Sequence, residues 1–217
     1  MDSREIFKRI DHTLLKPDAT LREIEVLCEE ASRYGAASVC IPPCYVSRVY
    51  NKYSYLPITT VIGFPCGYSV AGTKVFEAEQ ALQVGATEID MVVNIGDVKN
   101  KAFHRIMAEI TAVKRVADEH ILKVIIESGY LDEKEKIELC SILGASGADY
   151  LKTCTGFASK GAELEDMQLF RQYLPNHVKI KAAGGICSKQ TMEDFLNAGA
   201  SRLGCSSGVK ILFGENK

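Results

Sequence analysis

Two lysines in short apolar runs are the residues of this sequence best suited to chemistry. Lys152 lies in the run YLKTCTG (150–156), and Lys181 lies in the run IKAAGGI (180–186). Lysine is seldom buried without a partner or a task, because removing an ammonium group from water is costly. A lysine becomes a nucleophile when burial or a second cation lowers its pKa from about 10.4. Two such lysines side by side indicate an enzyme that forms an imine with a carbonyl substrate.

Asp90, in the run EIDMVVNIG (88–96), is the carboxylate best suited to assist this pair. A carboxylate there could move protons through a bound water and keep the second amine charged. The alternative is that Asp90 and the two lysines are members of a buried ion network without chemistry.

Turns rich in glycine or hydroxyl residues follow three of the apolar runs. They are Thr155-Gly156, Gly184-Gly185 and CSSG (205–208). Backbone N–H groups in such turns, together with a short helix N-terminus, form an anion site. Three such turns at neighbouring strand ends indicate a phosphorylated small substrate.

A repeated junction organises the elements that must position these residues. Gly-Ala dipeptides occur at 35–36, 85–86, 147–148 and 199–200, each after a helical pattern and before an apolar run. Glycine supplies the left-handed cap of a helix and lets the next strand begin at once. Each interval fits two strand–helix units, so eight units are expected, the number that closes a parallel barrel. The expected strands are 10–14, 38–41, 59–64, 88–93, 123–127, 150–153, 179–182 and 202–204.

The intervening segments carry apolar residues at i, i+3 and i+4, which is typical of helices that pack on a sheet. Thr20 and Glu23 match a capping box at the start of the first long helix. The expected helices are 21–34, 45–53, 73–84, 102–119, 133–143, 163–173, 189–198 and 206–213. Because no long loop interrupts them, residues 1–217 are expected to form one (β/α)8 TIM-barrel domain with a short N-terminal extension.

Strand parity then sorts the charged residues. Helices cover the outside of a barrel, so the apolar positions of each strand should face outward and the alternate positions inward. This rule predicts that a set of charged side chains faces the barrel interior: Glu88, Asp90, Lys123, Glu127, Lys152, Lys179, Lys181 and, less clearly, Asp11. We expect Glu88, Lys123 and Lys179 to form an ion network in the lower layers. Asp90, Lys152 and Lys181 are expected nearer the carboxyl ends of the strands, where barrel active sites lie.

Composition excludes several classes of protein. The content of 47% hydrophobic and 25% charged residues is ordinary for a globular chain. A formal charge of −2 without a basic run argues against a nucleic-acid partner. The charged start and the lack of an 18-residue apolar segment predict a cytoplasmic protein without a membrane partner. The eight cysteines show no CxxC pair and no spacing with histidines, so reduced thiols and no metal site are expected.

Six motifs resemble those of the class I 2-deoxyribose-5-phosphate aldolases, in the same order and over nearly the whole chain. They are IDHTLLKPDAT (10–20), VIGFPCG (61–67), EIDMVVNIG (88–96), YLKTCTG (150–156), IKAAGGI (180–186) and GCSS (204–207). The resemblance implies reversible cleavage of 2-deoxy-D-ribose 5-phosphate to acetaldehyde and D-glyceraldehyde 3-phosphate. It also implies that no cofactor is needed, because the imine does the work that a metal does in other aldolases.

The resemblance assigns roles residue by residue. Lys152 matches the imine-forming lysine, and Lys181 matches the second lysine, which perturbs it and assists proton transfer. Asp90 matches the proton-relay aspartate, and Asp11 matches its supporting acid. The residues expected to contact the substrate or its phosphate are Thr155, Gly156, Gly185, Ser206, Ser207 and Cys40.

Some positions depart from the family pattern. Pro42 stands where asparagine is common, Cys66 where leucine is usual, and Cys154 and Cys205 at positions often filled by other small residues. The tyrosine-bearing tail of some relatives is also missing. None of these changes touches the lysines or Asp90, so the reaction class is expected to stand.

Two other functions remain open on the sequence. One is a different Schiff-base barrel enzyme, such as a transaldolase or an aldolase for another sugar phosphate. The other is a barrel that binds a sugar phosphate without catalysis. The sequence also leaves the oligomeric state open, and a homodimer or a homotetramer is compatible with it.

Overall fold

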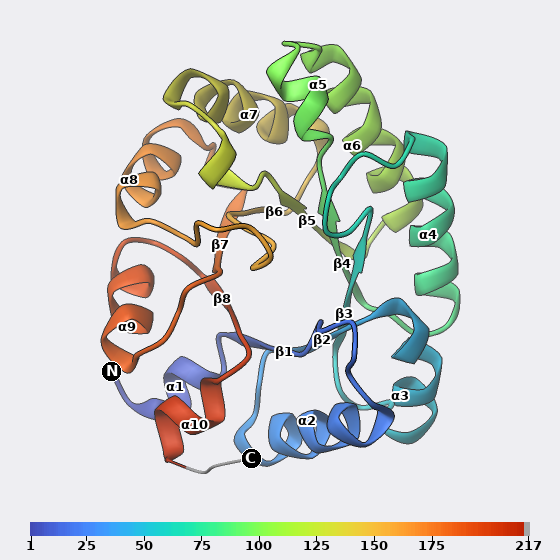
Figure 1. The fold of residues 1–217 in the computed structure, drawn as a ribbon, viewed down its shortest axis with the longest axis vertical. Helices are drawn as coiled ribbons and strands as arrows, with labels where there is room; N and C mark the ends of the chain where they lie inside the picture. Colours follow the sequence, from blue (N-terminus) through green and yellow to red (C-terminus); the bar gives the residue numbers. More distant parts are fainter. Residues whose placement is uncertain (215–217) are drawn as a thin grey trace.

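The computed structural model describes residues 1–214, which form a closed barrel of parallel strands arranged in sequence order (Figure 1). The strands are β1 (Ile10–Thr13), β2 (Ser38–Ile41), β3 (Ile58–Ile62), β4 (Glu88–Val92), β5 (Ile121–Ile125), β6 (Tyr150–Lys152), β7 (Lys179–Ala183) and β8 (Arg202–Cys205). The barrel closes where β8 pairs with β1, with Asp11 opposite Gly204. The predicted single-domain TIM barrel is confirmed.

The helices surround the barrel on its outer face (Figure 1). They are α1 (Ser3–Phe7), α2 (Leu21–Tyr34), α3 (Val46–Lys52), α4 (Ala71–Gln83), α5 (Ile95–Lys99), α6 (Phe103–Ala117), α7 (Glu133–Ser146), α8 (Leu164–Tyr173), α9 (Lys189–Asn197) and α10 (Gly208–Phe213). Eight of these match the helices expected from sequence, with small differences at their ends. The short helices α1 and α5 were not expected, nor were the 3-10 turns η1 (Pro43–Tyr45) and η2 (Ser128–Tyr130).

Two of the four Gly-Ala junctions form the predicted left-handed cap, whereas the C-caps of α4 and α9 are Val84 and Ala198, one residue before their glycines. Gly35 and Gly147 end α2 and α7 with φ angles of 74° and 82°, in the left-handed region that favours glycine. Strand β2 begins three residues after Gly35. At the start of α2, the predicted capping box between Thr20 and Glu23 is present in both directions. These local signals therefore fix where helices stop and strands begin.

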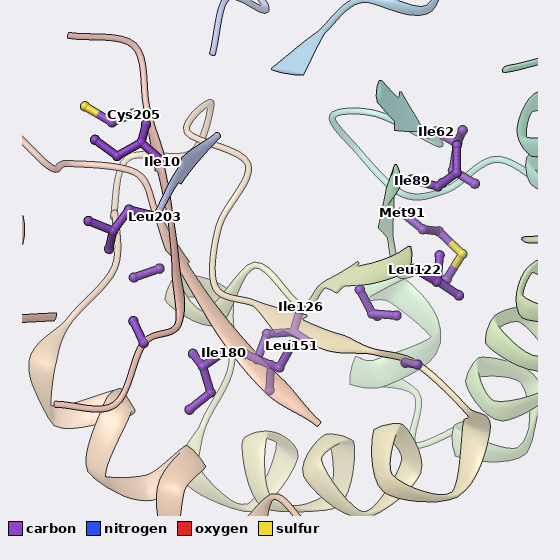
Figure 2. Packing of buried hydrophobic residues seen from close by; sticks show 14 of the residues in the cluster. Ile10, Ile62, Ile89, Met91, Leu122, Ile126, Leu151, Ile180, Leu203 and Cys205 are labelled. Atoms are coloured by element: carbon purple, nitrogen blue, oxygen red, sulfur yellow. The ribbon is translucent and has the colours of Figure 1, made fainter. Parts of the chain in front are cut away.

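The hydrophobic core lies between the strands and the helices, and not inside the barrel. Figure 2 shows this layer, with Ile89 and Met91 of β4 and Leu151 of β6 among its members. Burying one such side chain stabilises the fold by roughly 1.5–3 kcal/mol. Because this layer uses the outward positions of every strand, the inward positions are free to carry charge.

Strand β5 begins and ends two residues earlier than predicted. It spans Ile121–Ile125, because the chain leaves the extended conformation at Glu127, where φ is 50°. Glu127 is therefore a residue of the loop after β5, and its expected place inside the strand is wrong.

His12 has a structural role. Its ring is buried and its Nε2 lies 2.6 Å from Oε2 of Glu30 on α2. The ring also meets the edge of Phe7, at 5.5 Å between ring centroids. Elsewhere, no helix within residues 1–214 has both the length and the apolar character needed to cross a membrane.

Candidate active site

Lys152 and Lys181 lie directly opposite each other on adjacent strands. The register of β6 and β7 pairs the two residues, and both side chains are buried inside the barrel. Lys152 Nζ donates to Oδ2 of Asp90 at 2.8 Å, and Lys181 Nζ donates to the same oxygen at 2.7 Å. The structure thus brings together the three residues that parity placed near the strand ends.

Asp90 accepts hydrogen bonds from three lysines. Its second oxygen, Oδ1, accepts from Lys123 Nζ at 2.9 Å. Burial acts to raise the pKa of the Asp90 carboxyl, but the charges of the three lysines outweigh it and hold that pKa well below its ordinary value. Asp90 is therefore a carboxylate at every pH at which the protein would work.

Asp11 forms the other half of this network. It is ion-paired with Lys181, and its Oδ1 accepts from Arg202 Nη1 at 2.5 Å and from Ser38 Oγ at 2.8 Å. Burial again acts to raise its pKa, but Lys181, Lys123 and Arg202 together lower it. Asp11 contacts Lys181 and not Lys152, so it distinguishes the two lysines of the pair.

The pKa of Lys181 differs from the expectation that each lysine lowers the other's pKa. Burial acts to lower the pKa of Lys181, but the charges of Asp11 and Asp90 outweigh it and raise that pKa above its ordinary value. Lys181 is therefore held as a cation. The expectation that the two lysines lower each other's pKa is wrong for Lys181. That expectation considered only the two amines, whereas Asp11 and Asp90 both contact the Lys181 ammonium.

The lower layer of the barrel is an ion network, as expected, although one of its members differs. Lys123 Nζ lies 2.5 Å from Oε2 of Glu88. Lys179 was expected there, but it is exposed at the first position of β7, with its ammonium 5.7 Å from the ring centre of Tyr150. Arg202 of β8, which sequence reasoning missed, takes this place and lies 3.4 Å from Glu88.

A cavity of about 420 Å³ opens above this network, at the carboxyl ends of β1 and β6–β8. The residues predicted to contact substrate that line it are Lys152, Thr155, Gly156, Gly185, Ser206 and Ser207. Four other predicted site residues, Asp11, Cys40, Asp90 and Lys181, are fully buried and do not line this cavity. Of the lysine pair, Lys152 is thus the member that reaches it.

Glycine-rich turns line this cavity. Gly184 and Gly185 have φ angles of 91° and 75°, a consecutive left-handed pair that residues with side chains rarely adopt. Within residues 1–214, the backbone N–H groups of Gly156, Gly185 and Ser206 have no acceptor among the protein's hydrogen bonds. Free N–H groups at three neighbouring strand ends form a concave site suited to an anion.

Thr155 is tied to Glu127 and does not aim its donors at the cavity. Its backbone N–H donates to both carboxylate oxygens of Glu127 at 3.2 Å, and its hydroxyl donates to Oε2. The same hydroxyl accepts from the N–H of Phe157 at 3.0 Å. Thr155 and Glu127 together fix the turn that presents Gly156. The positive φ at Glu127 could not be read from its sequence neighbours.

The cysteines fall into two groups. Cys44, Cys66 and Cys187 are exposed, whereas Cys28, Cys40, Cys140, Cys154 and Cys205 are buried, and all eight are free thiols. Burial raises the pKa of Cys40. Among residues 1–214, no group of three or more His, Cys, Asp or Glu side chains is arranged to hold a metal ion.

Parallel barrels carry their sites at the carboxyl ends of the strands. Here two lysines from adjacent strands share one carboxylate beneath a cavity that glycine-rich turns line, a layout suited to a barrel aldolase. The comparison with known proteins narrows this class. The family model described as "DeoC/LacD family aldolase" matches residues 5–213. The chain belongs to this family.

Individual relatives agree in sequence and in fold. A deoxyribose-phosphate aldolase of Clostridium botulinum (strain Alaska E43 / Type E3) is 51% identical over 216 residues, covering 99% of this chain and 98% of the relative. A solved structure from Coccidioides immitis has a TM-score of 0.94 at 40% identity, covering 98% of this chain and 86% of that one. The tetrameric deoxyribose phosphate aldolase from Aeropyrum pernix has a TM-score of 0.91 at 31% identity, with 97% and 91% covered.

Proposed function

We propose that this chain is a class I aldolase that reversibly cleaves 2-deoxy-D-ribose 5-phosphate through an imine on Lys152. The observation that carries the proposal is that two lysines share Oδ2 of Asp90, and that Lys152 alone of the two reaches the cavity. The name of the Clostridium botulinum relative supplies the substrate. The products are acetaldehyde and D-glyceraldehyde 3-phosphate.

The charge balance of the barrel interior supports a neutral amine. Within residues 1–214, four cationic side chains, Lys123, Lys152, Lys181 and Arg202, are paired with three carboxylates, Asp11, Glu88 and Asp90. Loss of one proton leaves three cations against three carboxylates, and a buried site favours that balance. Lys181 is held charged by its two carboxylates, so we assign the neutral amine to Lys152.

In the proposed mechanism, the neutral amine of Lys152 attacks C1 of the open-chain aldehyde and gives a carbinolamine. Loss of water then gives the iminium. Lys181 and Asp90, the latter through a water molecule, transfer the protons of these steps. Asp11 keeps Lys181 charged and in position.

The two-carbon product identifies the bond that breaks as C2–C3. The C3 hydroxyl loses its proton, C3 becomes the aldehyde carbon of glyceraldehyde 3-phosphate, and the electron pair of the broken bond moves to C2. The product on Lys152 is an enamine, stabilised because the iminium nitrogen accepts that pair. Protonation of C2 and hydrolysis of the imine release acetaldehyde and restore the amine.

The phosphate is proposed to bind at the rim formed by Gly156, Gly185, Ser206 and Ser207. Their turns follow β6, β7 and β8, and free N–H groups there suit phosphate oxygens. Thr155 holds the first of these turns. Cys40 is proposed to lie beneath the substrate, because it is buried near Lys181, Asp90 and Lys152.

We further propose that residues 1–217 act as one aldolase domain in the cytoplasm, without a cofactor, and that the protein forms a homodimer or homotetramer. The support for an oligomer is the tetrameric Aeropyrum pernix relative. Light scattering after size-exclusion chromatography measures the mass directly, and a monomer at micromolar concentration would contradict this part.

Borohydride trapping tests the catalytic proposal. Incubation with 2-deoxyribose 5-phosphate and sodium borohydride, followed by peptide mass spectrometry, should find a reduced adduct on Lys152. An adduct on Lys181 would reverse the lysine roles, and no adduct would exclude imine catalysis. Lys179→Met is a matched control, because this lysine is exposed and forms no ion pair within residues 1–214. That variant should be trapped like the unmodified chain.

A further inference from the structure

We propose that Lys16 is the cation that binds the phosphate of the substrate and so selects phosphorylated over unphosphorylated sugars. The proposal rests on the proposed function, because it assigns a role in the binding of that function's substrate. Of the described residues that line the 420 Å³ cavity, only Lys16 and Lys152 carry a basic side chain, and none carries a carboxylate. The rest of the lining is glycine, hydroxyl, thiol or apolar residues.

A sugar phosphate brings close to two negative charges into this cavity. Free N–H groups can bind its oxygens, but they do not neutralise the charge. Lys152 does not supply this charge, since its Nζ lies 2.8 Å from Asp90 and it is the amine proposed to attack the aldehyde. Lys16 is therefore the remaining source of positive charge.

The fold places Lys16 next to the phosphate rim. Strand β1 pairs with β8, with His12 opposite Cys205. The segment that follows β1 therefore lies beside Ser206 and Ser207, which follow β8, and all three residues line the same cavity. Sequence distance hides this proximity, because closure of the barrel joins its first and last strands.

The loop that carries Lys16 is anchored, although its side chain is exposed. The carbonyl of Lys16 accepts from the N–H of Ala19 at 3.1 Å, and the hydroxyl of Tyr45 donates to the carbonyl of Ala19 at 2.6 Å. No carboxylate within residues 1–214 lies within 4.0 Å of the Lys16 ammonium. A fixed backbone beside the rim, and an ammonium without a carboxylate partner among the described residues, suit the capture of an anion.

The alternative is that Lys16 binds a ligand in the neighbouring cavity and not the phosphate. That cavity, of about 750 Å³, lies between α2 and α10 and is lined by Lys16, Arg22 and Lys210 among others. Lys210 lines this second cavity and not the first. Lys210→Met therefore removes the same charge a short distance away and is a matched control for Lys16→Met.

The test compares Lys16→Met, Lys16→Arg and Lys210→Met on 2-deoxyribose 5-phosphate and on 2-deoxyribose. Lys16→Met should raise KM for the phosphorylated substrate about 10-fold, the scale of one charge-assisted hydrogen bond, with kcat unchanged. Its kcat/KM on 2-deoxyribose should stay the same, Lys16→Arg should recover most of the affinity, and Lys210→Met should match the unmodified chain. Equal losses on both substrates, or equal behaviour of the two methionine variants, would overturn the proposal.

Binding of inorganic phosphate tests the role of Lys16 independently of the proposed function. If the unmodified chain does not cleave 2-deoxyribose 5-phosphate, the proposed function fails, but calorimetric titration with phosphate still tests Lys16. Lys16→Met should then weaken phosphate binding about 10-fold relative to Lys210→Met. Equal phosphate affinity in the two variants would overturn the role of Lys16, whatever the activity.

Discussion

Lys152 and Lys181 donate to one and the same oxygen, Oδ2 of Asp90, at 2.8 and 2.7 Å. The two lysines are nevertheless not equivalent, because Asp11 contacts Lys181 but not Lys152. The pair is asymmetric, because both amines share Asp90 but only Lys181 also contacts Asp11. That asymmetry assigns the charged role to Lys181 and leaves Lys152 for the substrate.

Asp90→Asn should abolish most activity and strongly destabilise the barrel. Asparagine keeps the shape but removes the charge that three lysines share. Breaking a buried ion network from one side costs about 3–5 kcal/mol, and kcat should fall at least about 100-fold, the scale of one lost proton-transfer group. Urea denaturation and steady-state kinetics measure the two effects.

The control for this variant is Asp97→Asn. Asp97 pairs with Arg105 at 3.4 Å on the surface, and such pairs contribute roughly 0–1 kcal/mol. If Asp90→Asn were no less stable than Asp97→Asn, the shared carboxylate would not hold the barrel interior together.

The stability of the protein should fall as the solution is acidified. The pKa values of Asp11 and Asp90 are lower in the folded chain than the unfolded value of about 3.9. Groups of this kind stabilise the fold above the unfolded pKa, and this contribution is lost as pH falls through the folded pKa. The free energy of unfolding should therefore decrease from about pH 5 downward.

Lys181 predicts a loss of stability at high pH as well. Its folded pKa is raised, so its contribution to stability is complete below the unfolded value of about 10.4 and is lost as pH rises through the folded pKa.

Urea titrations between pH 3 and pH 8 test the predicted loss of stability at low pH. Asp11→Asn should flatten it, whereas Asp97→Asn should leave its slope unchanged, and an unaltered slope in Asp11→Asn would refute the assignment.

Strand parity predicted much of the site because it depends only on the period of a strand. The outward apolar residues of β4, β6 and β7 force Asp90, Lys152 and Lys181 into the barrel, and neighbouring parallel strands bring them to one level. The glycine junctions similarly predicted the order of strands and helices. Family resemblance, and not parity, provided the substrate.

The errors have a common physical origin. Lys179 and Arg202 both begin their strands, and parity alone cannot show that the first is exposed and the second partly buried against Asp11 and Glu88. The pKa of Lys181 depends on its contact with Asp11, a residue at the opposite end of the sequence. Both outcomes depend on how the barrel closes, which no local pattern encodes.

The bond between Thr155 and Glu127 predicts a change in substrate affinity without a change in chemistry. Thr155→Val keeps the side-chain shape but removes the hydroxyl that donates to Glu127 and accepts from Phe157. The turn that presents Gly156 should loosen, so KM for 2-deoxyribose 5-phosphate should rise about 10-fold, equivalent to roughly 1.4 kcal/mol. The turnover number should change little, because Lys152 and Asp90 do not contact this hydroxyl. Thr155→Ser, which retains the hydroxyl, should restore most of the affinity. A fall in kcat at unchanged KM would place Thr155 in the chemistry and contradict its role in holding the turn.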